Sequence, residues 1–240
     1  MKHASVPRPR SRRTLSAAAL ALSLSVSGLG TAEAADDLVV VVPEGTAKPA
    51  ALSGQVAQWR RDLGAYNVVF VDSVKREKPS GFGAMAVLDF TSAGQLDAWK
   101  RANAASLGAP LQATEVDVLT RGGAAPAASS KPVYKISYYT LTSPRETFQT
   151  WVDGYLTRYL DVQVEHGILT RYAMYLEQGP AGRALLVLEY TDAKTEQDAE
   201  PIKMKLSDDI ARATPAYARL SELKESLRTT QSWTLAVPAR

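Results

Sequence analysis

The sequence of 240 residues contains no cysteine and only two histidines. Without thiols the chain forms no disulfide bond, and thiol catalysis, zinc–thiolate sites and iron–sulfur clusters are excluded as well. His3 lies in the first 34 residues, which leaves His166 as the one histidine of the remaining chain. A single histidine cannot form a cluster of histidine ligands for zinc or copper, and it gives a hydrolase catalytic triad little support. The sequence therefore identifies no catalytic residue.

A basic excess is also missing once the N-terminal segment is set aside. Residues 1–34 begin with a basic stretch, continue with an apolar run over 15–29 and end in Ala32-Glu33-Ala34, which is the pattern of a secretory signal peptide. This segment holds five of the 28 Lys+Arg and one of the 25 Asp+Glu, so the rest has 23 basic and 24 acidic residues. We therefore expect no nucleic-acid partner.

The leader predicts that the mature protein is periplasmic or secreted and has no membrane segment after cleavage. A membrane anchor is the alternative, but the apolar run is short and interrupted by serines. The stretch Ser11-Arg12-Arg13-Thr14-Leu15 resembles a twin-arginine export signal, although Ser16 stands where a second apolar residue is usual. Leaders of the general secretory (Sec) pathway also carry paired arginines, and we favour Sec export over twin-arginine export.

Two short stretches of the remaining chain echo each other. Val87-Leu88-Asp89-Phe90-Thr91-Ser92-Ala93 and Val187-Leu188-Glu189-Tyr190-Thr191-Asp192-Ala193 each combine an apolar run, one acid, an aromatic residue, threonine and a helix-capping residue. This pattern is typical of a buried strand that leads directly into a helix. The elements around each copy follow the same order, so the chain is predicted to contain two related units.

The first unit, residues 35–120, has strand patterns over 38–42, 68–74, 84–90 and 111–119, with helices over 52–63 and from Ser92. Residues 121–132 are rich in Pro, Gly, Ala and Ser and are predicted to be a linker. The second unit, residues 133–240, has strand patterns over 133–141, 168–176, 184–190 and 231–237. Its first helix is expected to begin with Ser143 as the N-cap, and its later helical region is divided at Thr214-Pro215.

Each unit has the order βαββαβ, which is the ferredoxin-like arrangement with both helices on one face of an antiparallel sheet. The bare faces of the two sheets must be buried, and packing them together gives an intramolecular α/β barrel. The predicted class is therefore α+β with two ferredoxin-like repeats. The tandem layout, the tyrosine-rich strand over 133–139 and the repeated Val-Leu-acid-aromatic-Thr motif resemble the dimeric α/β-barrel superfamily, whose small members include antibiotic-biosynthesis-monooxygenase-like proteins.

This resemblance implies that a small, often aromatic ligand binds between the sheets. By strand alternation, Arg171 and Tyr175 point inward if Tyr172 faces the helices, and the same logic places Val187 and Leu235 inward with the other candidates. A one-residue slip would reverse every assignment. The alternative, which the commonness of ion pairs near strand ends favours, is a salt bridge among core aromatics with no ligand. The candidate pocket residues are Lys135, Tyr139, Arg171, Tyr175, Glu189 and Trp233.

Glu189 and Asp89 occupy the same place in the two repeats, and both are expected to lean into the space between the sheets. Lys135 or Arg171 could pair with Glu189, whereas the first repeat offers fewer strand cations to Asp89. His166 precedes Gly167 at the expected end of a helix, where a structural role is favoured by the helix dipole. The alternative role is haem ligation, because the superfamily that the chain resembles has chlorite-dismutase and dye-decolourising-peroxidase relatives that bind haem through one histidine of the second repeat; nothing else in the sequence resembles their motifs.

The combined prediction is an exported protein that binds a small hydrophobic or aromatic molecule and needs no cofactor. A cofactor-independent monooxygenase, which in the resembling family oxidises electron-rich aromatics without metal or flavin, is the alternative function, and a haem-binding protein is the third. Single-repeat relatives bury the bare face of their sheet by dimerising, whereas the two repeats of this chain can bury these faces against each other. The chain is therefore expected to be able to exist as a monomer, with a homodimer as the alternative.

Overall fold

The computed structural model describes residues 37–43, 50–76, 82–107, 111–124, 130–178 and 182–239. The expected signal peptide and the middle of the expected linker lie outside these residues. The first repeat contains β1 (Asp37–Pro43), α1 (Ala50–Leu63), β2 (Val68–Arg76), β3 (Phe82–Leu88), α2 (Ala93–Asn103) and β4 (Gln112–Gly123). The second contains β5 (Val133–Leu141), α3 (Arg145–Trp151), α4 (Thr157–Glu165), β6 (Leu169–Glu177), β7 (Arg183–Tyr190), α5 (Ala193–Ala213), α6 (Pro215–Glu222), α7 (Lys224–Leu227) and β8 (Arg228–Pro238).

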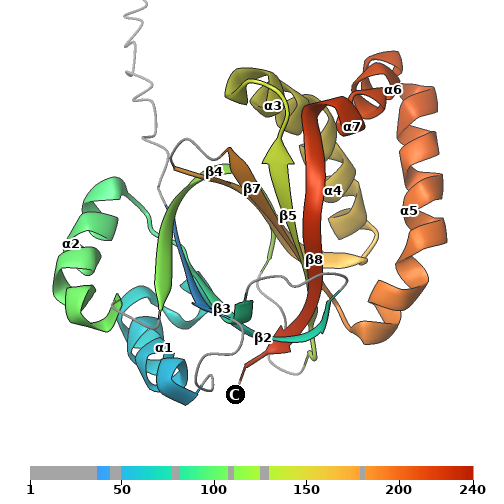
Figure 1. Ribbon diagram of the computed structural model, residues 1–240. Coiled ribbons are helices and arrows are strands. Elements are labelled where there is room, and N and C mark those ends of the chain that lie inside the picture. Colours follow the sequence, from blue (N-terminus) through green and yellow to red (C-terminus); the bar gives the residue numbers. More distant parts are fainter. Residues whose placement is uncertain are drawn as a thin grey trace, which may run out of the picture. The chain divides into compact units, whose positions relative to one another are not determined.

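The eight strands that the structure describes form one closed antiparallel barrel in the order β1-β3-β2-β8-β5-β7-β6-β4 (Figure 1). Within each repeat this is the ferredoxin-like strand order, with the first strand between the fourth and the third. The repeats join at two seams, β2 with β8 and β4 with β6. The predicted fold, an α+β chain whose two repeats close an intramolecular barrel, is confirmed.

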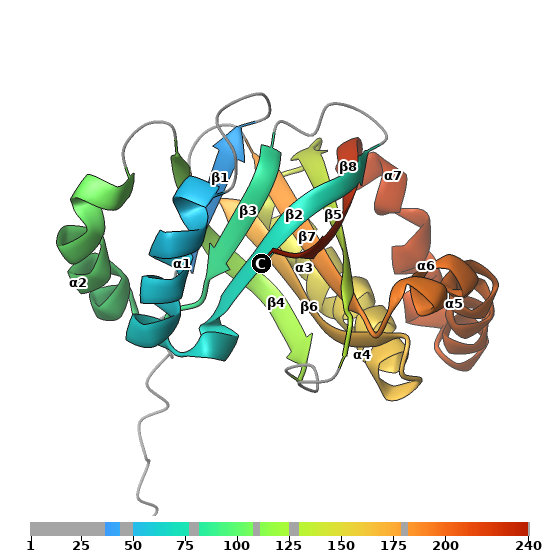
Figure 2. The ribbon, with the colours of Figure 1, turned by 90° about the horizontal axis from the view of Figure 1, so that it is seen from below.

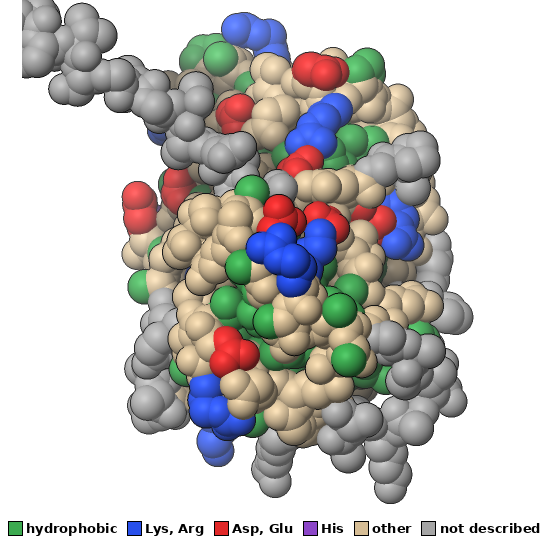
Figure 3. All heavy atoms as spheres, turned by 90° about the vertical axis from the view of Figure 1, so that its left-hand side faces the viewer, with side chains coloured by type: hydrophobic (Ala, Val, Ile, Leu, Met, Phe, Trp, Pro, Cys, Tyr) green, Lys and Arg blue, Asp and Glu red, His purple; other side chains and the backbone are tan. Residues whose placement is uncertain are grey.

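The helices cover the outside of the barrel, α1 and α2 on the first repeat and α3 to α7 on the second (Figures 1 and 2). The apolar residues accordingly form three clusters, one between sheet and helices in each repeat and one inside the barrel. Acidic and basic side chains are interspersed on the solvent face over α1 and α2 (Figure 3). None of the helices that the structure describes is long and apolar enough to span a membrane.

The echoed motif begins a helix in the same way in both repeats. The Ser92 hydroxyl accepts a hydrogen bond from the Gln95 backbone N–H at 3.2 Å. The Asp192 carboxylate accepts one from the Thr195 backbone N–H at 2.7 Å. Each bond satisfies one of the unpaired N–H groups at a helix start, so the sequence echo corresponds to a structural repeat.

Two expected boundaries are wrong, and one expected capping hydrogen bond is absent. Pro144, not Ser143, is the N-cap of α3, and the Ser143 hydroxyl instead donates to the Leu227 carbonyl oxygen at 3.2 Å. Thr214 precedes α6 as expected, but its side chain makes no capping hydrogen bond. β4 continues through Arg121, Gly122 and Gly123, three residues into the expected linker, because these residues pair with Ala173, Tyr172 and Arg171 of β6.

Candidate functional site

The register of the strands brings two sets of polar side chains to one end of the barrel. In the second repeat Tyr134 lies directly opposite Glu189. In the first repeat the pairing of Leu38 with Leu88 extends by one residue to place Asp37 opposite Asp89. Directly opposed residues of antiparallel strands project to the same face. Tyr134 therefore occupies in the second repeat the position that Asp37 occupies in the first.

A cavity of about 360 Å³ lies at this end of the barrel. Its apolar wall includes Val69, Val87, Ala173 and Val187, which come from four strands and both repeats. An apolar cleft of this size with a few convergent polar groups is the usual form of a small-molecule site. The polar residues that line it are Asn67, Asp89, Arg121, Tyr134, Arg171, Tyr172, Tyr175 and Glu189.

Glu189 forms the ion pair of the second repeat. Its side chain is 1% exposed, and one carboxylate oxygen is 2.7 Å from Arg171 Nε. The Thr170 hydroxyl donates to the other oxygen at 2.7 Å. Tyr134 lies beside this pair, and burial together with the Glu189 charge raises the pKa of its hydroxyl above the ordinary value. Strands β6 and β7 thus hold Arg171 and Glu189 in place, and Tyr134 of β5 lies beside them.

Two carboxyl groups meet in the first repeat. The Asp37 side chain is fully buried, accepts a hydrogen bond from the Phe90 backbone N–H at 3.1 Å and lies 3.1 Å from Arg121 Nη2. Arg121 Nη1 is 3.7 Å from Asp89. Burial and the neighbouring Asp89 carboxylate raise the pKa of Asp37 to about 8, and burial raises the pKa of Asp89 as well. The two groups therefore retain a proton near neutral pH.

One oxygen of Asp89 remains available to a ligand. Asp89 Oδ1 is buried and has no hydrogen-bond partner among the described residues, and Asp89 lines the cavity. Tyr175, which also lines the cavity, has a pKa raised by burial and by the charges of Asp89 and Asp37. The cavity therefore offers an unpaired acceptor and a protonated phenol to a bound molecule.

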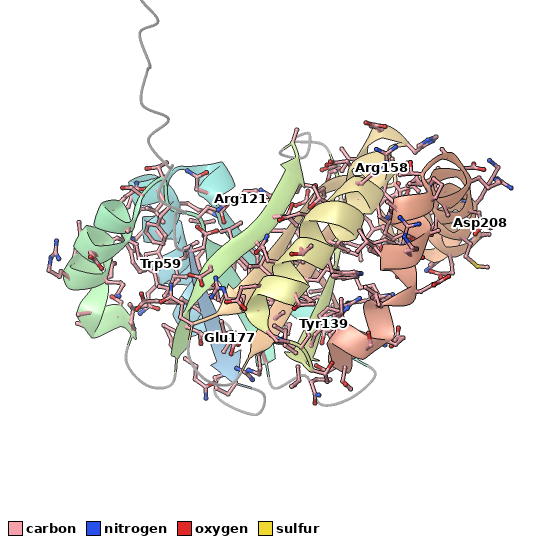
Figure 4. All side chains as sticks on the ribbon, turned by 90° about the horizontal axis from the view of Figure 1, so that it is seen from above. Trp59, Arg121, Tyr139, Arg158, Glu177 and Asp208 are labelled. Atoms are coloured by element: carbon pink, nitrogen blue, oxygen red, sulfur yellow. The ribbon has the colours of Figure 1, made fainter. Side chains whose placement is uncertain are left out.

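Three of the six candidate pocket residues line this cavity, namely Arg171, Tyr175 and Glu189. The other three do not, so their expected inward orientation is wrong, while the ligand-binding role of the candidates stays a prediction. Lys135 and Tyr139 alternate with the inward-facing Tyr134 and thus point outward, and Tyr139 packs in the core between sheet and helices (Figure 4). Trp233 pairs with Ser137 of the same outer face. Lys135 Nζ lies 5.3 Å from the Trp233 ring centroid.

Sequence reasoning missed Asp37, Tyr134 and Arg121 as site residues. The expected alternation puts Tyr134 on the outer face, and the two glycines that follow Arg121 make it resemble part of a linker. The signal for Asp37 lies in the repeat. When Leu88 is aligned with Leu188 and the first strand of each repeat is paired with the third, Asp37 and Tyr134 occupy equivalent positions. That comparison requires the pairing register, which the sequence alone does not fix.

His166 lies away from this site. It follows the last residue of α4, its backbone N–H donates to the Val162 carbonyl oxygen at 3.0 Å, and its side chain is exposed. It is not among the residues that line the barrel cavity. The haem interpretation required this histidine to face a pocket, and its position gives that role no support. Among the described residues no cluster of three or more His, Asp or Glu side chains could hold a metal ion.

The fold is similar to that of several solved structures. An anthrone oxidase-like protein is 5% identical, with a TM-score of 0.53 over 87% of this chain and 92% of that one. A candidate monooxygenase from Fusobacterium nucleatum is 10% identical, with a TM-score of 0.52 over 86% and 94% of the two chains. One from Lactobacillus acidophilus is 8% identical, with a TM-score of 0.50 over 86% and 93%.

At these identities the similarity establishes the fold alone, which is the α/β barrel of two ferredoxin-like repeats expected from the sequence. No protein-family model matches the sequence. No curated protein matches it either.

Proposed function

We propose that the protein binds a small hydrophobic or aromatic molecule in the barrel cavity. The observation that carries the proposal is the combination of an apolar cavity of about 360 Å³ with the unpaired, buried Asp89 Oδ1 in its wall. A buried acceptor without a partner is unfavourable, so a ligand that donates a hydrogen bond gains more there than an apolar one. A phenol, with an apolar ring and a hydroxyl donor, has both features.

A thermal-shift series with one- and two-ring phenols and their methyl ethers tests this proposal. The phenols are expected to raise the melting temperature more than the ethers, because only the phenols donate to Asp89. Absence of any shift, or equal shifts from phenols and ethers, would contradict the proposal. Fluorescence of Trp233 is a poor reporter, since this residue is on the outer face of the barrel.

A second function, cofactor-independent oxidation of an electron-rich hydroxyarene, is supported by the carboxyl groups of Asp37 and Asp89. A carboxylate that faces the ligand and has a raised pKa is suited to accept a proton from a phenolic hydroxyl, and the resulting anion is the form that reacts with dioxygen. The barrel fold is also that of an anthrone oxidase-like protein.

Oxygen consumption with quinol and anthrone substrates separates the two functions. An enzyme would consume oxygen, and Asp89→Asn would abolish consumption, because an amide cannot accept the proton, while ligand-induced stabilisation persists. Stabilisation of the wild type without oxygen uptake would leave the binding function alone.

We also propose that the protein is exported after removal of residues 1–34. The support is the sequence pattern of the leader. Edman sequencing or mass spectrometry of the protein from the periplasmic fraction is expected to give Ala35 as the first residue. Full-length protein confined to the cytoplasm would contradict export.

A further inference from the structure

A second cavity, of about 150 Å³, lies outside the barrel between the sheet of the second repeat and helices α4, α5 and α7. Four leucines contribute the aliphatic part of its wall, and Tyr155 and Tyr159 contribute aromatic rings. Leu186 and Leu188 of β7 line it, whereas Val187, between them, lines the barrel cavity. The two cavities are therefore on opposite faces of the same sheet.

Arg228, the first residue of β8, lines this second cavity with a buried guanidinium. The residue is 6% exposed, and its Nε and Nη1 atoms have no hydrogen-bond partner among the described residues. The guanidinium carbon lies 3.6 Å from the ring centroid of Tyr139 and 5.2 Å from that of Trp151. Cation–π contacts offset only part of the free energy that burying a charge requires, and among the described residues no acid forms a salt bridge with Arg228.

The surrounding charges also favour an anion. Lys203 and Lys224 line the cavity together with Arg228, and among the described residues of its wall Glu200 is the one acid. Lys203 Nζ donates to the Tyr190 hydroxyl at 2.6 Å and is half-buried. Glu200 and Lys224 are exposed, which places them at the solvent side. An entering anion therefore meets cations both at the opening and at Arg228.

Gln163 offers a hydrogen-bond acceptor to the same cavity, whereas Arg228 offers donors. Its side chain is 1% exposed, Nε2 donates to the Tyr159 carbonyl oxygen at 3.2 Å, and Oε1 has no partner among the described residues. Because Gln163 also lines the cavity, its unpaired oxygen is an acceptor for a ligand hydroxyl or amino group. The cavity thus presents buried hydrogen-bond donors on Arg228 and a buried acceptor on Gln163. A matching ligand carries an anionic acceptor group and a separate hydrogen-bond donor.

We propose that this cavity binds a small single-ring aromatic carboxylate that bears a hydroxyl or amino group. The carboxylate accepts hydrogen bonds from Arg228, the ring packs against Tyr155 and Tyr159, and the donor bonds to Gln163. A guanidinium is suited to bidentate recognition of a carboxylate. The site is independent of the barrel cavity, so neither proposal rests on the other.

Thermal-shift and calorimetric titrations with hydroxybenzoate, hydroxybenzamide, benzoate and inorganic phosphate test the site. Hydroxybenzoate is expected to stabilise the wild type. Hydroxybenzamide lacks the charge and phosphate lacks the ring, so each is expected to bind at least tenfold more weakly. No binding of hydroxybenzoate, or equal binding of either analogue, would overturn the proposal.

Substitutions of the side chains that line the cavity test which of them hold the ligand. Arg228→Met is expected to abolish hydroxybenzoate binding, whereas Lys205→Gln, which removes an exposed charge from the same helix as Lys203, is expected to leave it unchanged. Gln163→Leu keeps Arg228 in place and is expected to remove the preference for hydroxybenzoate over benzoate. Persistent binding by Arg228→Met, or a persistent preference in Gln163→Leu, would refute the assignment.

Ala173→Leu, which narrows the barrel cavity instead, is expected to leave hydroxybenzoate binding intact. Loss of hydroxybenzoate binding in this variant would place that binding at the barrel mouth and overturn the second site. Failure of phenols to bind at the barrel leaves the hydroxybenzoate result unaffected, so the two proposals fail separately.

Discussion

At the residue scale, Glu189 and Asp89 hold matching positions in the two repeats but have different surroundings. Glu189 is buried against one cation, Arg171, and its side chain is 1% exposed. The Asp89 side chain is 24% exposed, lies farther from Arg121 and adjoins a second carboxyl group, Asp37. Both acids face the barrel cavity, as the alternation of the strands predicted. Their contributions to stability should nevertheless differ.

Glu189→Gln is expected to lower the free energy of unfolding by about 3 kcal/mol, because it leaves Arg171 largely buried without its counter-charge. Asp89→Asn is expected to have a smaller effect, since it also relieves repulsion with Asp37. Urea unfolding of both variants gives the comparison. Glu177→Gln is the control, because its partner Arg183 is 51% exposed and the expected loss is about 0–1 kcal/mol. Equal, negligible effects of all three variants would place Glu189 in solvent.

Asp37 predicts a specific pH dependence of stability. Because its pKa is raised from 3.8 to about 8 in the folded state, the folded protein keeps a proton that the unfolded chain releases. Stability should therefore fall as pH rises from about 4 to about 8, by up to about 1.4 kcal/mol per pH unit. The groups that face Asp37 are Asp89, Arg121 and the Phe90 N–H.

Asp37→Asn imitates the protonated acid and is expected to remove this part of the pH dependence. Urea unfolding of wild type and variant at pH 5 and pH 7.5 measures the difference, and the variant should gain relative stability at the higher pH. Parallel changes in the two proteins would contradict the raised pKa of Asp37.

At the element scale, the close pairing of β4 with β6 depends on glycine. A Cβ atom on Gly122 would lie 2.7 Å from the ring of Tyr172, and one on Gly123 would collide with the Thr170 carbonyl oxygen. Gly123 also has a φ of 86°, in the left-handed region. These two glycines let the repeats approach each other beside the cavity, although in the sequence they resemble the start of a linker.

Gly123→Ala is therefore expected to destabilise the protein by more than the roughly 1–2 kcal/mol of the left-handed backbone alone. Gly54→Ala is the matched control, because a Cβ there meets no atom within 4 Å and alanine favours the interior of α1 by about 0.5–1 kcal/mol. Thermal unfolding should give opposite signs for the two substitutions. A neutral Gly123→Ala would mean that β4 does not approach β6 so closely.

The sequence predicts the position of most strands and helices, but it does not predict which face of every strand points into the barrel. The echoed motif located β3, β7 and the following helices correctly, because an apolar run followed by a capping residue is a local signal. The local sequence does not show which face of β5 or β8 points into the barrel, since both alternating sets of β5 side chains are rich in tyrosine or apolar residues. Only the pairing of Tyr134 with Glu189 and of Ser137 with Trp233 assigns them. Half of the candidate site was therefore predictable and half required the register.

At the scale of the whole molecule, closure of the barrel uses every strand edge within one chain. β2 pairs with β8 and β4 with β6, so among the described strands no edge remains for a partner chain. The protein is therefore expected to be able to fold and remain stable as a monomer. Light scattering over a range of concentrations measures this, and a dimer that dissociates only into unfolded chains would show that the barrels form between chains.

The most direct test of the central claim is calorimetric titration of three proteins, the wild type and two variants, with the phenol that gives the largest thermal shift. Ala173→Leu adds bulk to the cavity wall, whereas Ala113→Leu adds the same bulk at an exposed position of β4. A site in the barrel predicts unchanged affinity for Ala113→Leu and at least a tenfold loss, about 1.4 kcal/mol, for Ala173→Leu. Unchanged affinity in Ala173→Leu would contradict the assignment of the binding site to this cavity.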